Sequence, residues 1–388
     1  MDAGKVESKS KAPNTRKRKR SGKGPLWAKV TLLVASLAFL FVVAEIGLRL
    51  SGAKPRTATT LNSFFQPDAN AGWVGRPDIA IWFTTSDFNV LATHDASGLR
   101  QCGVDSLNEP AKNSAEDREQ EVVWCVGDSY TWGWGVADED TWVARLNQSD
   151  EGRRVFRNLG VPGYSSLQEY LLVKERFENG EQPDQILLVY SCNDPQDNLA
   201  PRGAPYLKVA DGQAVIEDYP SPPPSISRSA RAWMKRHFLA VNYLDYHLMR
   251  AKGGLFGKEN AAYDPVVQKA RNSDVAPKAW SERERIGMHY VYAMFKELCD
   301  EQAVSLVVVT YDRQPEIDQL CHELAIDRLD VSPGFRDHAM SAEEPAPTVF
   351  KHDNHWNETG NRIMAASLID ALQQKQIAQQ ADSSSKTR

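Results

Sequence analysis

Residues 122–133 read VVWCVGDSYTWG, a short apolar run followed at once by glycine, aspartate and serine. A continuous apolar run of this length is typical of a strand that is buried on both faces, as in a parallel sheet. Ligands of open parallel sheets bind beyond the carboxyl ends of the strands. Ser129 stands among turn-forming residues just past this strand, so its hydroxyl and backbone N–H are candidates for meeting a ligand. On its own, Gly-Asp-Ser is also compatible with an ordinary turn.

Outward from this run, further apolar runs alternate with segments of helical periodicity. The expected strands are residues 155–156, 186–190 and 304–310, and the expected helices are residues 141–146, 167–177, 281–300 and 359–372. The third helix opens with a capping box, Ser281-x-x-Glu284. Strands that alternate with helices predict an α/β fold, a parallel sheet flanked by helices in three layers.

The rest of the body divides into smaller segments. Residues 72–100 alternate apolar and polar positions, which predicts strands or a hairpin. Residues 195–280 interrupt the alternation of strands and helices. They contain PSPPP at 220–224 and a Gly-Gly pair at 253–254, so we expect an insertion there. The expected organisation is a basic tail at 1–28, a transmembrane helix at 29–50, a linker at 51–70, a catalytic domain at 71–375 and a disordered tail at 376–388.

Charge is distributed unevenly between the N-terminal region and the rest of the chain. Residues 1–29 hold ten Lys/Arg and two acidic residues, and the other 359 residues hold 36 bases and 49 acids. Residues 30–44 carry no charge, and with their flanks they reach the roughly 20 residues that cross a bilayer. The positive-inside rule then keeps the N-terminus in the cytoplasm and exports the body, to the periplasm or the cell exterior. A signal peptide cleaved near Ser51-Gly52-Ala53 and a buried core helix are the alternatives.

Composition argues against several classes of function and site. The acidic body argues against a nucleic-acid interface. The five cysteines are scattered without zinc spacing, and an odd number does not make a disulfide framework. Cys125 is expected in the core, while Cys102 is a candidate for a disulfide with another cysteine.

Three more motifs follow the Gly-Asp-Ser turn in order. They are Asn158-Leu-Gly-Val-Pro-Gly163, Asn193-Asp194 after the third strand, and Asp353-Asn-His355-Trp-Asn before the last helix. With them, the chain resembles the SGNH (GDSL-type) hydrolase family across residues 120–372. The segment at 95–100, DASGLR, is similar to the lead-in of membrane-anchored members.

The resemblance implies a role for each matching residue. Ser129 matches the nucleophile, His355 the general base and Asp353 the acid that orients it. Gly163 and Asn193, with the Ser129 N–H, match the oxyanion hole. The chemistry agrees, because a serine hydroxyl needs an adjacent base and the tetrahedral oxyanion needs preorganised donors. Neither a metal nor another cofactor is expected.

The motifs also depart from the family. Tyr130 replaces the Leu of GDSL, Ser191 stands where Gly is frequent, and one residue rather than two separates Asp353 from His355. This last spacing is similar to alginate O-acetyltransferase-like proteins. We therefore expect a membrane-anchored serine esterase acting on a short acyl group, acetyl above all, on a carbohydrate. An O-acyltransferase using the same triad and a non-catalytic glycan-binding module are the alternatives.

Several residues have competing interpretations. His352, Asp353 and His355 could bind a metal, although no strong further ligand is evident. Tryptophans gather around Ser129, where we expect most in the core and one or two along a sugar-binding cleft: Trp124, Trp132, Trp134 and Trp142. The remaining histidines are isolated and receive no functional role: His94, His237, His247, His289, His322 and His338.

Overall fold

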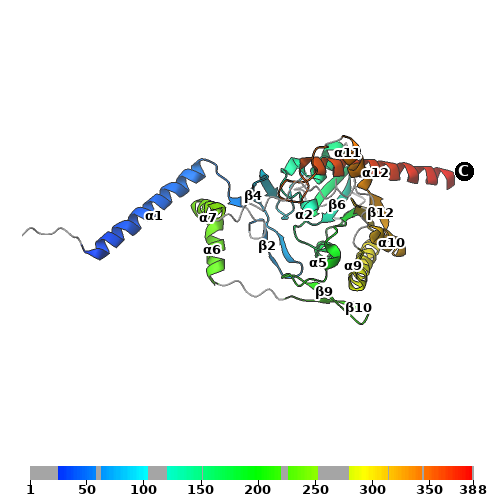
Figure 1. The fold of residues 1–388 in the computed structure, drawn as a ribbon, viewed down its shortest axis with the longest axis horizontal. Coiled ribbons are helices and arrows are strands. Elements are labelled where there is room, and N and C mark those ends of the chain that lie inside the picture. Colours follow the sequence, from blue (N-terminus) through cyan, green and yellow to red (C-terminus); the bar gives the residue numbers. More distant parts are fainter. Residues whose placement is uncertain are drawn as a thin grey trace, which may run out of the picture. The chain divides into compact units, whose positions relative to one another are not determined.

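A computed structural model describes residues 25–57, 63–103, 120–150, 152–219, 226–251, 279–312, 314–342 and 345–386 (Figure 1). The chain forms two compact units, which divide between Gly52 and Ala53.

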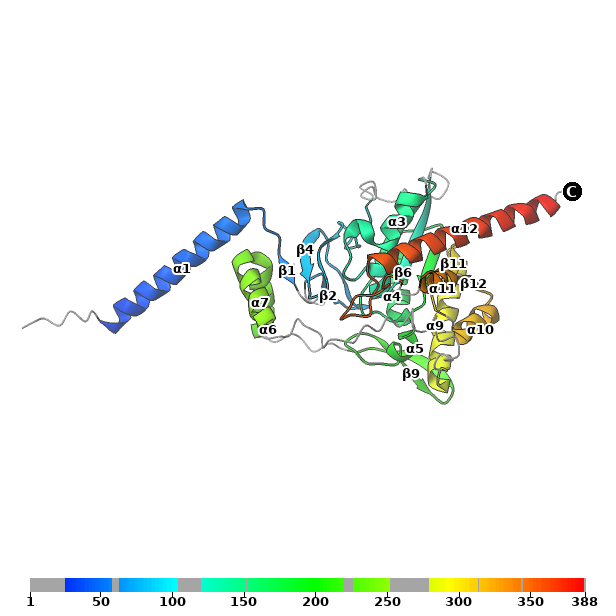
Figure 2. The ribbon, with the colours of Figure 1, turned by 45° about the horizontal axis from the view of Figure 1, so that its top comes forward.

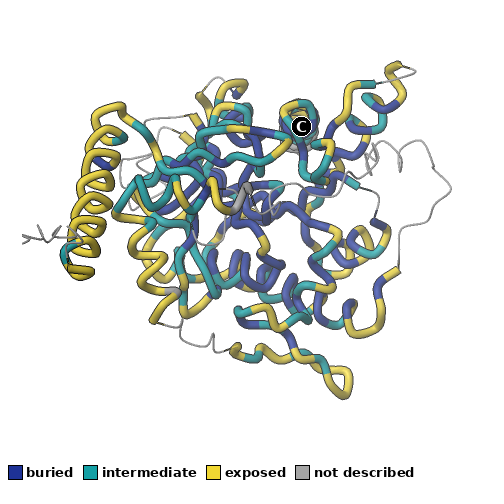
Figure 3. Tube along the Cα trace, turned by 60° about the vertical axis from the view of Figure 1, so that its left-hand side comes forward, coloured by how far each residue is buried: buried dark blue, intermediate teal, exposed yellow. Residues whose placement is uncertain are grey.

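The described part of the first unit is one helix, α1 (Leu26–Leu50). Most of its residues are exposed, as the yellow helix in Figure 3 shows, and its one buried residue, Glu45, pairs with Arg49, whose Nε lies 2.7 Å from Glu45 Oε1. By length and composition α1 could cross a membrane, a property that signal sequences share. The apolar helix expected from the sequence is therefore present.

The second unit is built around a five-stranded parallel sheet, of which the sequence predicted the parallel arrangement and four strands. Its strands are β6 (Glu121–Gly127), β7 (Arg154–Gly160), β8 (Gln185–Val189), β11 (Ser305–Thr310) and β12 (Asp327–Asp330). The spatial order is β12-β11-β8-β6-β7, and every neighbouring pair is parallel. The strand that precedes Ser129 therefore lies inside the sheet, between β8 and β7.

Strand β6 buries both of its faces. Trp124 and Val126 contribute to one apolar cluster with α4 (Ser166–Glu178), α9 (Glu282–Glu301) and α10 (Pro315–Glu323). Val123 and Cys125 contribute to another with α3 (Trp142–Ser149), α11 (Ser332–Met340) and α12 (Glu358–Lys386). Side chains alternate along a strand, so helices must cover both faces of this sheet. The two helix layers are seen in Figure 2.

The chain before β6 adds small sheets to this body. β4 (Ile79–Thr84) pairs with β5 (Asn89–His94) and with β1 (Arg56–Thr57), and β2 (Phe65–Asp68) pairs with β3 (Gly72–Gly75). Phe64 and Phe65 are almost completely buried. Part of the segment at 51–70 therefore packs into the core, where the sequence suggested only a linker.

The insertion at 195–280 holds two structured pieces. β9 (Tyr206–Ala210) and β10 (Gln213–Glu217) form a hairpin, whose turn residues Asp211 and Gly212 both have positive φ. α6 (Ile226–His237) and α7 (Leu239–Ala251) form a pair of helices. Residues 220–225 and 252–278 of the insertion lie outside the described residues. At the C-terminus, α12 continues to Lys386, through most of the segment expected to be disordered.

Candidate active site

The Ser129 turn joins β6 to a short helix, α2 (Ser129–Trp132). Asp128 caps this helix by accepting a hydrogen bond from the Tyr130 N–H at 2.9 Å. A Cβ on Gly127 would lie 2.2 Å from Thr131 Oγ1, so the turn requires glycine there. Ser129 opens α2, where a helix N–H has no intrahelical acceptor. The strand and cap thus place both the Ser129 hydroxyl and its N–H at the carboxyl edge of the sheet.

Ser129, His355 and Asp353 form a hydrogen-bonded row. Ser129 Oγ lies 2.7 Å from His355 Nε2, and His355 Nδ1 lies 2.5 Å from Asp353 Oδ1. Asp353 Oδ1 also accepts the His355 backbone N–H at 3.0 Å. The two residues are close in the chain, yet Ser129 is 226 positions away from His355. The fold therefore brings together the three residues that the sequence analysis selected.

Trp134 contacts both His355 and Asp353 of this row. Its ring stacks on the His355 ring, with centroids 4.8 Å apart and planes 18° from parallel, and its Nε1–H donates to Asp353 Oδ2 at 2.9 Å. Burial alone would raise the pKa of Asp353, but the hydrogen bonds from His355 and Trp134 lower it overall. Asp353 therefore stays ionised beside the imidazole.

The loop that carries Asp353 and His355 is closed at its base. Val349 bridges to Trp356, and the Asn357 amide donates to Val349 O at 3.0 Å and Pro347 O at 2.8 Å. Asn357 Oδ1 caps α12 by accepting the Thr359 N–H at 2.9 Å.

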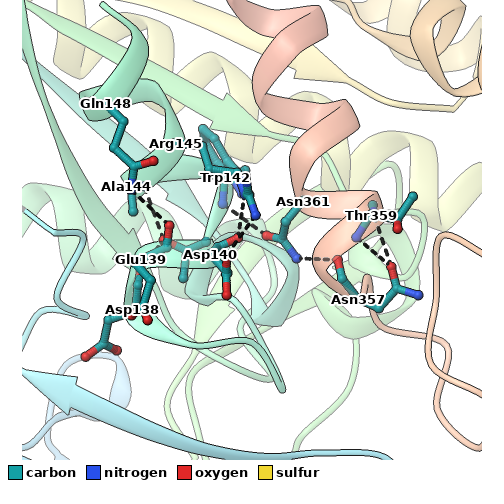
Figure 4. Close-up of polar contacts among 12 residues, drawn as sticks. Asp138, Glu139, Asp140, Trp142, Ala144, Arg145, Gln148, Asn357, Thr359 and Asn361 are labelled. Atoms are coloured by element: carbon teal, nitrogen blue, oxygen red, sulfur yellow. Dashed lines mark hydrogen bonds and ion pairs between the residues drawn. The ribbon is translucent and has the colours of Figure 1, made fainter.

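A neighbouring contact ties α12, which follows this loop, to the start of α3 (Figure 4). Asn361 Oδ1 accepts the Trp142 N–H at 3.0 Å, while the Trp142 indole donates to Tyr130 O at 3.2 Å. The base segment and the nucleophile segment are thereby held in a common frame.

Gly163 and Asn193 follow β7 and β8, the two strands that flank β6. Gly163 has φ of +83°, which favours glycine, and Trp73 lies next to it with Nε1–H bonded to Pro162 O at 3.2 Å. The Asn193 amide donates to Asp197 Oδ2 at 2.9 Å. An amide carries two N–H groups, so a second remains for another acceptor. Both residues lie at the same sheet edge as Ser129.

Three buried carboxyl groups lie on the segments that carry these residues. Asp128 precedes Ser129, Asp194 follows Asn193, and Glu169 lies in the first turn of α4, just after Gly163. Burial raises the pKa of all three, and the charges of the neighbouring carboxyl groups raise those of Glu169 and Asp194 further. Sequence reasoning gave Glu169 no role, because one acidic residue in an amphipathic helix has no distinguishing local pattern.

Two residues at the lead-in segment, Arg100 and His94, contact Trp132 of α2, the helix that begins with Ser129. Arg100 is buried, and its Cζ lies over the Trp132 ring, 4.5 Å from the ring centroid. Its Nη2 forms an ion pair with Asp138 Oδ1 at 3.0 Å. His94 accepts the Trp132 indole N–H at 3.0 Å, and burial lowers the pKa of His94 to about 3. His94, which the sequence left without a role, is thus a neutral structural partner of the helix that begins with Ser129.

The tryptophans near Ser129 separate into two groups. Trp124, Trp132 and Trp142 are at most 1% exposed and belong to the core, whereas Trp134 faces His355. Trp73, on β3, was missed by sequence reasoning because its approach to Gly163 depends on contacts 90 residues apart in the chain. Two aromatic rings, one from this small sheet and one from the Ser129 segment, therefore border the site.

Metal-ligand geometry is absent from the described residues, where no group of three His, Cys, Asp or Glu side chains could hold an ion. His352 bonds instead to Asp87 at 2.5 Å. Cys102 is a buried free cysteine, so the disulfide considered for it does not form. A hollow of about 540 Å³ lies between the β9–β10 turn, α9 and α10, and neither Ser129 nor His355 lines it.

The chain matches the sequence model of one protein family. The sequence model of the GDSL-like Lipase/Acylhydrolase family matches residues 125–363. No curated protein matches the chain.

Among solved structures, the chain is similar to a putative lipolytic protein of the G-D-S-L family from Desulfitobacterium hafniense DCB-2, with 12% identity, a TM-score of 0.33, and coverage of 64% of this chain and 98% of the other. The acetyl xylan esterase AlAXEase gives 12% identity, a TM-score of 0.36, and coverage of 64% and 98%. The family match spans more than half of the chain and contains the whole hydrogen-bonded row. The chain therefore belongs to the GDSL-like lipase/acylhydrolase family and is an ester-hydrolysing enzyme with an α/β fold.

Proposed function

We propose that this protein is a membrane-anchored serine esterase that removes short acyl groups, acetyl above all, from a carbohydrate. The observation that carries the proposal is the row from Ser129 Oγ through His355 to Asp353, with successive distances of 2.7 and 2.5 Å. Such a row lets a neutral hydroxyl lose its proton as it attacks a carbonyl.

The acylation step follows from this geometry. Ser129 Oγ attacks the ester carbonyl carbon while its proton passes to His355 Nε2. The carbonyl oxygen becomes the oxyanion of a tetrahedral intermediate, which the N–H groups of Ser129 and Gly163 and the Asn193 amide stabilise. The intermediate then collapses, His355 returns the proton to the departing sugar oxygen, and an acyl-Ser129 ester remains. Asp353 stays ionised throughout and stabilises the imidazolium.

Deacylation repeats these roles with water as the nucleophile. His355 takes a proton from the water, whose oxygen attacks the acyl carbon, and Ser129 leaves with the proton that His355 returns. A sugar hydroxyl could replace the water, which would make the same site an O-acyltransferase. The single residue between Asp353 and His355, a spacing similar to that of acetyl-transfer enzymes, is the feature that favours this second function.

Two features support a carbohydrate substrate. Trp134 lies against His355, and Trp73 lies beside Gly163, so aromatic rings flank the reacting atoms. Aromatic faces suit the apolar faces of sugar rings. Membrane anchoring is supported by α1 and by the basic residues before it, which favour export of the body.

Alanine substitutions test the mechanism. Ser129→Ala, His355→Ala and Asp353→Ala should each lower the turnover of aryl acetates by several orders of magnitude, and their effects should not add, because the three groups act as a unit. Asn193→Ala should cost on the order of 10²–10³ in kcat. A fluorophosphonate probe should label the wild type and not Ser129→Ala. Labelling of a folded Ser129→Ala protein would identify a different nucleophile.

Product analysis tests the substrate class. The purified protein is incubated with an acetylated glycan, and separately with an acetyl donor and an unmodified glycan. Released acetate in the first reaction supports hydrolysis, and glycan acetylation in the second supports transfer. Faster cleavage of long-chain esters, with neither glycan changed, would exclude this substrate class and leave the serine mechanism standing.

A further inference from the structure

Helix α6 exposes the side that a water-soluble helix normally buries. Its apolar residues Ile226, Ala230, Trp233 and Met234 recur at the spacing of one helical face. Ile226 is 89% exposed, Trp233 55% and Met234 41%. We call these four residues the outer face of α6. A contiguous exposed apolar surface of this kind marks an interaction site.

The opposite, basic face of α6 explains this orientation. Arg231 and Lys235 both pair with Asp245 of α7, the Lys235 Nζ–Asp245 Oδ2 distance being 2.9 Å. α6 and α7 lie side by side in Figure 2. The ion pairs therefore bind the polar side of α6 to α7 and turn the outer face away from it.

Helix α7 is itself fastened to the body. The Asn242 side chain accepts the Arg56 N–H at 2.7 Å and donates to Arg56 O at 3.1 Å, and the Tyr243 hydroxyl donates to Lys54 O at 3.2 Å. The helix pair is thus held by the strand segment at residues 54–57, and the outer face cannot turn inward without breaking these bonds.

The helix pair is basic on an acidic body. Residues 226–251 contain five Lys/Arg and one Asp, a net charge of +4, whereas the chain as a whole has a net charge of −5. A helix with bulky apolar residues on one face and basic residues around it is typical of proteins that lie in the headgroup region of anionic membranes.

We propose that the outer face of α6 inserts into the headgroup region of an anionic phospholipid bilayer. This inference rests on the proposed membrane span of α1. Lys54 follows Leu50 by four residues, a stretch of at most about 14 Å. A bilayer that holds α1 therefore ends within reach of the strand segment to which α7 is fastened. The second attachment would limit the rotation of the catalytic body over the membrane.

A depth measurement on the full chain tests the proposal. The protein is placed at one copy per nanodisc, in a Cys192→Ser background, because Cys192 is the exposed cysteine and the other four are buried. A fluorescent label is attached through Ile226→Cys, and matched labels through Met340→Cys on α11 and Phe39→Cys on α1, whose native side chains are 71% and 68% exposed. Quenching by doxyl-labelled lipid then reports the depth of each label.

In discs that contain phosphatidylglycerol, we expect quenching and a blue shift at positions 226 and 39 and neither at position 340. Arg236→Gln should lower the ratio of membrane-bound to membrane-free helix pair by about fivefold, which is the contribution of one basic residue near an anionic surface. Arg283→Gln, an exposed change on α9, should leave this ratio unchanged.

The three labels separate the ways in which the proposal could fail. Quenching at position 39 without quenching at position 226 would leave the membrane anchor standing and overturn the docking of α6. No quenching at either position would overturn both. A label at position 226 that is shielded only in discs with two copies would assign the outer face to a second copy of the chain and overturn the lipid proposal.

Discussion

Asp353 holds His355 through contacts that suit their close spacing. A single carboxylate oxygen accepts both the His355 ring N–H and the His355 backbone N–H, at 2.5 and 3.0 Å. This leaves the other oxygen for Trp134, at 2.9 Å. With one residue between acid and base, the local turn fixes one oxygen and the indole fixes the other. Trp134 is therefore a positioning residue whose effect reaches the reaction through Asp353.

Trp134→Phe tests this role, because phenylalanine keeps a ring against His355 and removes the indole donor. We expect kcat/KM to fall by about tenfold, equivalent to ~1.4 kcal/mol of barrier. The hydrogen bond from Trp134 contributes to the lowered pKa of Asp353, so its removal should raise that pKa. The acidic limb of the pH–rate profile should therefore move to higher pH, and an unmoved limb would reduce Trp134 to a packing role.

The buried Glu169 carboxyl group predicts how the stability of the protein depends on pH. Its folded-state pKa is raised by burial and by the charges of Asp194 and Asp128. The unfolded chain releases this proton above about pH 4.3 while the folded chain keeps it. The contribution of Glu169 to stability is then greatest below that pH and declines as the pH rises toward the folded-state pKa.

Glu169→Gln removes this ionisation and keeps the side-chain shape. We expect its free energy of unfolding, measured in urea from about pH 4.5 to 8, to fall less steeply with pH than that of the wild type. Glu301→Gln, an exposed change on α9, is the matched control and should follow the wild type. A Glu169→Gln curve parallel to that of the wild type would mean that Glu169 is ionised in the folded protein.

At the scale of elements, Asn357 connects the catalytic loop to α12. Its oxygen caps the Thr359 and Gly360 N–H groups, and its amide holds two carbonyls across the loop base. Asn357→Ala should lose roughly 1–2 kcal/mol of stability, the upper range for an N-cap, and should lower kcat because His355 is less fixed. Asn357→Asp keeps the cap and loses the two amide donors.

The pair of variants separates the functions of Asn357. Thermal unfolding should show a smaller loss of stability for Asn357→Asp than for Asn357→Ala, while turnover falls in both. Full turnover in Asn357→Asp would show that the amide contacts across the loop base do not position His355.

The central elements could be predicted because each has a pattern within a few residues. The runs at 122–126 and 186–190 are apolar at every position, and strands buried on both faces require that pattern. Ser281 and Glu284 form the predicted capping box at the start of α9. The motif residues could be placed at one sheet edge because they follow strands that proved to be neighbours, β7, β6 and β8.

Other elements depend on distant contacts and lack such patterns. β1 has two residues and forms only because β4 pairs with it. Trp73 and Trp134 have similar local surroundings to the core tryptophans, so composition could not show which rings reach the site. The outer face of α6 has an ordinary amphipathic pattern, and the exposure of its apolar residues and the ion pairs to Asp245 reveal that this side points outward.

At the scale of the whole molecule, charge and hydropathy divide the chain into three zones. Residues 1–25, before α1, have a net charge of +7, and residues 51–388, after it, have a net charge of −13. Within α1, Glu45 is paired with Arg49 at 2.7 Å near the C-terminal end, and in the proposed membrane span this pair would lower the cost of a carboxylate close to the bilayer interface. This arrangement favours a cytoplasmic N-terminus and an exported catalytic body.

The orientation can be tested by changing charge alone. In the wild type, a reporter that fluoresces only when folded in the cytoplasm should stay dark when fused after Arg388. Replacing the five basic residues at 16–20 by glutamine reduces the net charge before α1 from +7 to +2. Because Lys and Arg near the span set its orientation, part of the population should then invert and fluoresce.

The N-terminal mass of the mature protein provides the control. An intact N-terminus with a dark reporter supports a membrane anchor. A mass that corresponds to a chain beginning near Ala53 would show that α1 is a cleaved signal sequence. Fluorescence in the wild type would contradict export itself. The hydrogen-bonded row at Ser129 would then act on cytoplasmic esters rather than on glycans outside the cell.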